Sequence, residues 1–259
     1  MKSNVRRELK FAIPLLILIM IAAVVFWDFP GMWFQQDEWH SFGFIASEGI
    51  RYVTLDHSPL QLLLSDRIGA RAINYLLFTQ FGLTSQWYAA VAFLFHLVNT
   101  ALVYVLASSL IKKKAGAWIA ALFFFVNSVS HQAFTWFGTM AGSAPSVTFV
   151  LLSVMYYVKF LREENKRAMY ISLLFLWISF FFKETGIFLF ALYPLYYLLF
   201  KRGKMGKMVK IHIPFIAYGV LTVVLRMSEI FAPAGETNVL ITARTGLGGI
   251  IGNLFLYPI

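Results

Sequence analysis

The chain has 259 residues, of which 59% are hydrophobic and only 13% are charged. Soluble domains carry roughly 25% charged and about 45–50% apolar residues, so the composition excludes an ordinary soluble domain and indicates a membrane protein. The absence of cysteine excludes disulfides and thiolate metal sites. In such a chain the distribution of charge matters more than the net charge of +10, and we expect a lipid bilayer, with no nucleic acid, as partner.

The first apolar run covers about residues 11–27 and follows the basic segment MKSNVRRELK. A cleaved signal peptide would end in a small-residue site of the A-x-A kind, but the chain continues into Asp28, Phe29 and Pro30. We therefore expect an uncleaved first spanning helix, near the lower length limit for crossing a bilayer.

The segment 28–85 is the one long loop before residue 200. It opens with FQQDEWHSFGF, which carries Asp37, Glu38 and His40 directly after an apolar run. Its second half contains Arg67, Arg71 and Asn74 at i, i+4 and i+7. This spacing predicts an amphipathic helix lying along the membrane interface, with two guanidinium groups on its polar side.

Further apolar runs follow along the rest of the chain. Apolar runs in a bilayer must be helical, because hydrocarbon offers no partner for backbone N–H and C=O groups. The sequence therefore predicts an all-α polytopic membrane protein with about seven to eight transmembrane helices, forming a single transmembrane domain over 1–259. The spans after the first are expected at about 86–111, 117–130, 144–161, 168–182, 186–200 and 211–226, with the tail 246–259 beginning an eighth.

Basic residues fix the expected orientation of these spans. They concentrate in the segments 1–10, 112–114, 159–167 and 201–210, whereas most acids lie in the alternate segments. The positive-inside rule then predicts a cytoplasmic N-terminus and an acidic extracytoplasmic face. We expect a multi-pass protein of the plasma (inner) membrane, with the 28–85 loop outside.

This topology gathers candidate functional residues on the extracytoplasmic side. A carboxylate there can act as general base on a hydroxyl, and arginine or lysine can bind a lipid phosphate. Acids near histidines also suit a divalent cation, although no metal-motif spacing is present, so the metal stays undetermined. The candidates are Asp37, Glu38, His40, Asp56, His57, Arg67 and Arg71 in the first loop, His131 in the second, and Lys183 and Glu184 in FFFKETGIF.

Each candidate also has a purely structural interpretation. Adjacent Asp37 and Glu38 are compatible with a solvated loop, and Lys183–Glu184 with a polar hairpin held at the interface by snorkelling. The two arginines suit anionic headgroups. His96 and Asn99, in FLFHLVNT, are expected to make hydrogen bonds between helices rather than to bind a ligand.

Four stretches resemble the GT-C class of membrane glycosyltransferases, in particular the protein O-mannosyltransferase-like branch that includes tetratricopeptide-containing members. The likeness covers roughly residues 1–205. Each motif is short, and their order and spacing carry the specificity. They are QQDEW, FHLVNTALVYVLASSL, FFFVNSVSHQAFTWFGTMAGSAPSVTFVLLSVMYY and FFFKETGIFLFALYPLYYLL.

The resemblance implies transfer of a sugar from a polyprenyl-phosphate donor to a protein, lipid or glycan acceptor at the extracytoplasmic face. At the positions that match the family's motifs, the resemblance implies that Asp37 is the catalytic base and that Glu38 supports it or a metal. It also implies that Lys183 and Glu184 lie in the region of the donor phosphate. Phosphate contacts from Arg67 and Arg71 follow from their charge and helical face. His57 and His131 are further candidates for the site.

Two departures from the family pattern stand out. Glu38 replaces an aspartate often found in the acidic pair, and the chain ends at LFLYPI inside an apolar run. We therefore expect the N-terminal part of a longer chain. Two other classes stay open: a transporter or flippase, with charges buried in mid-span and helices broken at matching places in two halves, and a non-catalytic assembly protein.

Overall fold

The computed structural model describes residues 20–21, 24–55, 59, 62, 67–111, 113–127, 135–201 and 205–231. Within these residues every regular element is helical, which confirms the predicted all-α class. The α-helices are α2 (Gln36–Glu48), α3 (Arg51–Thr54), α5 (Ile68–Phe81), α6 (Ser85–Leu110), α7 (Lys114–Val126), α9 (Phe137–Glu163), α10 (Lys166–Phe180), α11 (Leu189–Lys201) and α12 (Met205–Phe231). Two short 3-10 helices, η1 (Phe29–Gly31) and η2 (Glu184–Gly186), lie before α2 and α11.

Two of the described helices, α6 and α9, are long and apolar enough to cross a membrane. They have 26 and 27 residues, and a helix needs about 20 apolar residues to span the hydrocarbon. Shorter apolar helical segments cover Lys114–Val126, Glu184–Leu199 and Met208–Val224. The predicted first span lies mostly outside the described residues, and the tail 246–259 lies wholly outside them.

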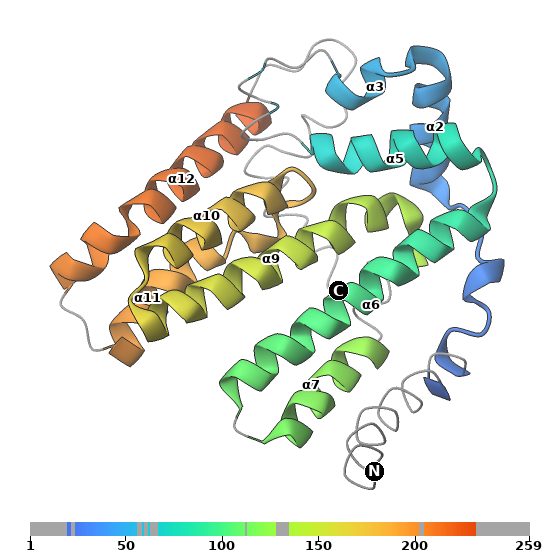
Figure 1. Cartoon of the computed structure of the whole chain (residues 1–259). Helices are drawn as coiled ribbons and strands as arrows, with labels where there is room; N and C mark the ends of the chain where they lie inside the picture. Colours follow the sequence, from blue (N-terminus) through green and yellow to red (C-terminus); the bar gives the residue numbers. More distant parts are fainter. Residues whose placement is uncertain are drawn as a thin grey trace, which may run out of the picture.

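The long helices form the body of the molecule, and the first-loop helices gather at one end of it. α9 packs between α6 and α10, α7 packs on α6, and α11 packs on α12. α5 crosses the N-terminal end of α9 and contacts α2, α3 and α6 (Figure 1). The turn between α10 and α11 packs on α9 through η2. Three segments far apart in the sequence therefore meet over the beginning of α9.

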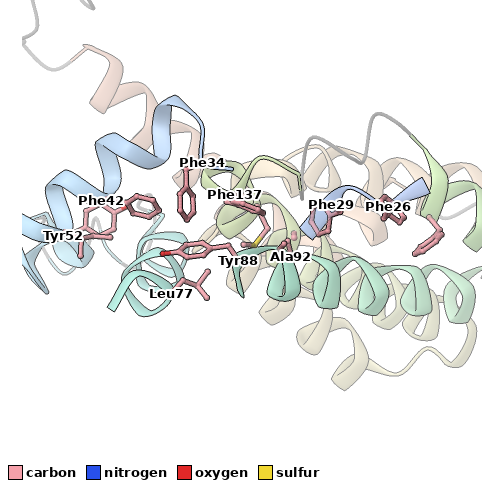
Figure 2. Close-up of a cluster of buried hydrophobic side chains, with 14 residues drawn as sticks. Phe26, Phe29, Phe34, Phe42, Tyr52, Leu77, Tyr88, Ala92 and Phe137 are labelled. Carbon is pink, nitrogen blue, oxygen red and sulfur yellow. The ribbon is translucent and has the colours of Figure 1, made fainter. Parts of the chain in front are cut away.

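Aromatic side chains hold this end together (Figure 2). The Phe34 ring lies 4.8 Å from that of Phe42, 4.9 Å from that of Tyr88 and 5.9 Å from that of Phe137, mostly edge to face. Such aromatic pairs contribute roughly 0.5–1.5 kcal/mol each beyond the area that they bury. The cluster thereby fixes α2 against the first turns of both α6 and α9.

A second core lies between α9, α10, α11 and α12 and contains buried polar groups. The Tyr157 and Tyr193 rings stack with centroids 3.9 Å apart. The Tyr157 hydroxyl lies 2.7 Å from Nε2 of the fully buried His212, whose Nδ1 donates to the Met208 carbonyl at 2.9 Å. Ser153 bonds both Ser172 and the Tyr193 hydroxyl. Buried polar groups are costly unless bonded, so these bonds fix how the four helices pack.

The amphipathic helix predicted around Arg67 and Arg71 is present as α5, but its polar side is occupied by other parts of the chain. Arg71 Nε donates to the Val53 carbonyl at 2.8 Å, and Asn74 Nδ2 lies 3.4 Å from the Tyr52 hydroxyl. The Gly69 amide donates to the carbonyl of Phe181 at 2.8 Å. These contacts join α5 to α3 and to the end of α10.

Candidate functional site

The first half of α9 is built almost entirely from small residues. The segment FGTMAGSAPS begins the helix, and its side chains at 140–146 are buried. Gly138 and Gly142 lie one turn apart on the same side of α9. A Cβ on Gly142 would lie 3.0 Å from the Phe182 carbonyl oxygen, and one on Gly138 would lie 3.4 Å from the Glu38 carboxyl carbon. Glycine therefore allows both neighbours to approach the helix backbone closely.

Glu38 joins the beginnings of two helices. Its side chain is only 2% exposed, and its carboxylate accepts hydrogen bonds from the Gln35 amide (3.0 Å), Trp136 Nε1 (3.2 Å) and the Gly138 amide (2.7 Å). Amides in the first turn of a helix have no partner within it, and negative charge is favourable there. One carboxylate therefore binds the N-terminal ends of α2 and α9 together.

Asp37, the neighbouring acid, has a different environment. Its side chain is exposed, and among the described residues none forms a hydrogen bond or ion pair with it. Its Cβ lies 3.6 Å from the position that a Cβ on Gly138 would occupy. The Glu38 bonds thus hold the backbone of Asp37 at the beginning of α9 and leave the Asp37 carboxylate open.

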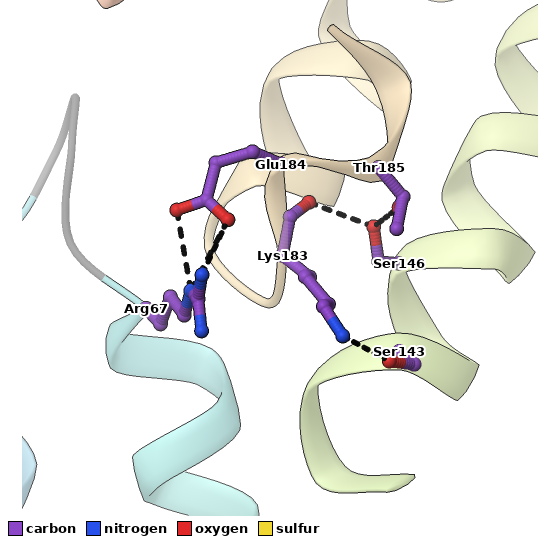
Figure 3. A network of polar contacts seen from close by, with 6 residues as sticks. All are labelled: Arg67, Ser143, Ser146, Lys183, Glu184 and Thr185. Atoms are coloured by element: carbon purple, nitrogen blue, oxygen red, sulfur yellow. Dashed lines mark hydrogen bonds and ion pairs between the residues drawn. The ribbon is translucent and has the colours of Figure 1, made fainter. Parts of the chain in front are cut away.

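Lys183 reaches the same half of α9 from the turn after α10 (Figure 3). Its Nζ donates to Ser143 Oγ at 2.9 Å, and its carbonyl accepts from Ser146 Oγ at 2.8 Å. Because Ser146 donates to that carbonyl, the Thr185 hydroxyl donates to Ser146. Burial lowers the pKa of Lys183, the nearby Arg67 charge acts in the same direction, and Glu184 opposes them.

Arg67 and Glu184 form an ion pair beside Lys183, 117 residues apart in the sequence (Figure 3). Arg67 Nη2 donates to Glu184 Oε2 at 2.8 Å, and Nε lies 3.2 Å from both carboxylate oxygens. The Arg67 side chain is 51% exposed and that of Glu184 is 21% exposed. The pair therefore lies at the protein surface, where Arg67 is accessible. Arg71 instead bonds the α3 backbone.

The predicted residues thus meet in part. Asp37 lies at Gly138 and Lys183 at Ser143, two points separated by roughly 7.5 Å along α9 at 1.5 Å rise per residue. Arg67 and Glu184 adjoin Lys183, whereas Arg71 points elsewhere. His57 and His131 lie outside the described residues, and His40 is exposed on α2. Three acids or histidines suited to a metal do not cluster anywhere in the described part of the chain.

Several contributing residues were not predicted as site residues, namely Trp136, Gly138, Ser143 and Ser146. The predicted span begins at about residue 144, whereas α9 begins at Phe137. A pattern of small residues spaced four apart could have indicated a close-packed helix in this segment. His96 and Asn99 do make the expected interhelical bonds, to the carbonyls of Phe125 (2.9 Å) and Ala144 (3.0 Å).

Comparison of the chain with protein-family models, with curated proteins and with solved structures finds no significant match. Function is therefore inferred from the site residues and from the sequence motifs.

Proposed function

We propose that the chain is a membrane glycosyltransferase that moves a sugar from a polyprenyl-phosphate donor to an acceptor at the extracytoplasmic face. The observation that carries this proposal is that two segments meet the first half of α9: Asp37 of α2, whose Cβ approaches Gly138 and whose carboxylate is open, and Lys183, whose ammonium binds Ser143. A base and a phosphate-binding cation are the two groups that such a transfer needs. The order of the four GT-C-like motifs supports the same conclusion.

The proposed topology is multi-pass in the plasma membrane, with a cytoplasmic N-terminus. Among the described residues α6 and α9 are long and apolar enough to span, and the proposal adds the shorter apolar helices as further spans. The site occurs where α9 begins, and the basic segment 159–167 follows at the other end of the same helix. By the positive-inside rule, this charge distribution supports an extracytoplasmic site.

In the proposed reaction, an acceptor hydroxyl attacks the anomeric carbon of the sugar as Asp37 takes the hydroxyl proton. The new bond joins the acceptor oxygen to that carbon, and the bond from the carbon to the phosphate oxygen breaks. Negative charge then grows on the departing lipid phosphate. Lys183 is suited to bind this phosphate, because its ammonium is held by a neutral hydroxyl while the adjacent Glu184 carboxylate bonds Arg67.

Glu38 fits a positioning role better than a metal-binding role. Both of its oxygens already accept N–H bonds, so a cation would have to displace backbone or indole donors. Asp37 is the acid of this pair whose carboxylate is open.

The test compares Asp37→Asn with Glu48→Gln, which removes another exposed acid from the same helix. Full-length protein is reconstituted with a polyprenyl-phosphate-linked sugar, and transfer to acceptor is measured together with thermal unfolding. We expect Asp37→Asn to abolish transfer without lowering the unfolding temperature, while Glu48→Gln retains activity. Unchanged turnover in Asp37→Asn overturns the assignment of the base.

One observation favours a transporter as the second candidate. His212 is fully buried on α12 and bonds Tyr157 on α9, and ionisable groups inside a membrane bundle commonly mark transport pathways. A transporter would move its lipid or solute across a vesicle membrane and lose this activity in His212→Phe. Sugar transfer that survives His212→Phe supports the enzyme instead.

A further inference from the structure

α2 has three distinct sides, and in the described part of the chain only one of them carries buried side chains. The covered side carries Glu38, Phe42 and Ile45. The exposed surface divides into two strips that run along the helix. The apolar strip consists of Trp39, Gly43 and Ala46, at i, i+4 and i+7. The polar strip consists of Asp37, His40, Ser47 and Glu48 and includes one apolar side chain, Phe44, which is 39% exposed and packs on Tyr52 of α3 at 6.1 Å.

Aromatic contacts locate the apolar strip relative to α6, the nearest candidate span. Phe34 packs on Tyr88, in the first turn of α6, with ring centroids 4.9 Å apart. The rings of Trp33 and Trp39 lie 5.4 Å and 5.9 Å from the same Phe34 ring. Both tryptophans are therefore at the level where the apolar helix begins.

A third exposed tryptophan lies at this level. Trp87 is in the first turn of α6, is 53% exposed, and stacks on Phe81 at 5.1 Å. Trp33 and Trp39 are 56% and 46% exposed. Tryptophan is enriched at membrane–water interfaces, where its apolar ring and its N–H group meet the headgroup region. Three exposed indoles at one level are typical of that interface.

We propose that Trp33, Trp39 and Trp87 lie in the outer headgroup region and that the apolar strip of α2 rests on the phospholipid surface. The polar strip, with Asp37, then faces water. The strip contacts lipid rather than a second protein, because it lies at the same depth as the first turn of α6, where that helix enters the hydrocarbon. The inference depends on α6 spanning the membrane and not on sugar transfer.

The proposal can be tested by site-specific labelling of single-cysteine variants. The chain has no cysteine of its own, so the label reacts only with the introduced thiol. Gly43→Cys and Ala46→Cys report on the apolar strip, and His40→Cys and Ser47→Cys are the matched controls on the polar strip. A Cβ at Gly43 meets no atom within 4 Å, and all four positions are exposed, so the label fits.

Each full-length variant carries a nitroxide label in a phosphatidylcholine–phosphatidylglycerol nanodisc. Accessibility to oxygen, which partitions into lipid, is compared with accessibility to a water-soluble nickel chelate. We expect labels at 43 and 46 to favour oxygen at least several-fold relative to labels at 40 and 47. The adjacent pair Ala46 and Ser47 gives the sharpest comparison, because only the direction around the helix differs.

Two results overturn the proposal. Equal nickel accessibility at all four positions means that the strip faces water, and protection of 43 and 46 from both reagents means that protein covers it. A measurement on unlabelled protein provides an independent check. Lipids brominated near the headgroup should quench a smaller fraction of tryptophan emission in Trp39→Phe than in the parent, and an unchanged fraction contradicts the proposed location.

Discussion

Glu38→Gln should lower stability strongly, although it replaces a carboxylate by a group of nearly the same shape. The glutamine amide retains one acceptor oxygen. At best it keeps the two bonds now made to Oε2, from the Gln35 amide and Trp136 Nε1, while its NH₂ group faces the Gly138 amide. The buried site therefore loses one charge-assisted hydrogen bond and gains two opposed donors.

The size of the loss follows from these contacts. A hydrogen bond to a charged group contributes about 1.5–3 kcal/mol, and loss of the anion at two helix N-termini adds roughly 0.3–1 kcal/mol at each. We expect Glu38→Gln to lower the free energy of unfolding by roughly 2–5 kcal/mol. Glu38→Ala leaves all three donors without their acceptor and should cost roughly 3–9 kcal/mol, at about 1–3 kcal/mol for each unsatisfied buried group.

Thermal unfolding in nanodiscs, followed by loss of monodisperse protein on size exclusion, measures this effect. At roughly 2–4 °C per kcal/mol for a chain of this size, Glu38→Gln should unfold roughly 4–20 °C below the parent. Glu48→Gln is the matched control, because it removes only an exposed ion pair with Arg51 at 3.3 Å. Such pairs contribute about 0.2–1 kcal/mol, so this control should unfold close to the parent.

Equal unfolding temperatures for Glu38→Gln and Glu48→Gln would refute the role of Glu38 in joining α2 to α9. A stable Glu38→Gln variant that has lost sugar transfer would do the same, because it would make Glu38 a reacting group. With Glu38 as a positioning residue and Asp37 as the base, Glu38→Gln lowers the stability of the protein, whereas Asp37→Asn lowers its activity alone.

Three further predictions follow from contacts elsewhere in the molecule. Because burial and then the Arg67 charge lower the pKa of Lys183, its ammonium should lose its proton on the alkaline side earlier than an ordinary lysine. The donor KM should then rise with pH in the parent and stay flat in Lys183→Arg; a flat profile in both would contradict the phosphate role. Arg67→Glu should lower the unfolding temperature, and adding Glu184→Arg should restore part of it, since the reversed pair can re-form; two strictly additive losses would argue against the pair. Tyr157→Phe removes the hydroxyl that bonds His212. It should lower the free energy of unfolding by about 1–2 kcal/mol, near the upper range for hydrogen bonds between membrane helices. Thermal unfolding that matches the parent would show that the bond does not form.

The sequence allowed the helical class, the position of α5 and the nature of two interhelical bonds to be predicted. Hydrophobic runs and the i, i+4 spacing are local properties, so a single sequence contains them. His96 and Asn99 were predicted correctly because a lone polar side chain within an apolar helix has few options other than a neighbouring backbone.

The role of Glu38 could not be predicted in this way. Two of its three partners, Trp136 and Gly138, come about a hundred residues later in the chain. An Asp–Glu pair in sequence says nothing about which acid is buried, and here the helix turn directs Glu38 inward and Asp37 outward. The pairing of Arg67 with Glu184, rather than of Arg71, depends in the same way on how α5 crosses α9.

The beginning of α9 was missed for a different reason. The segment of glycine, serine and alanine around Pro145 has a low intrinsic helix propensity, because glycine and proline disfavour helices in isolation. Its sequence therefore predicts a loop. Close packing by α2, α5, α6 and the turn before α11 outweighs that preference. Glycine and serine are the residues that permit such close contacts between helices.

The small residues in the first half of α9 also determine how mutation can act on the site. They supply hydroxyl and amide contacts but no charge. The acid and the cations therefore come from separate segments, which substitution can alter one at a time. Enlarging Gly138 or Gly142 would push against Glu38 or the Phe182 backbone and so displace more than one segment together. A saturation scan should therefore find few tolerated substitutions at the small residues of α9 and more in the segments that pack on it. Substrate specificity could then change through those segments while α9 keeps their relative positions.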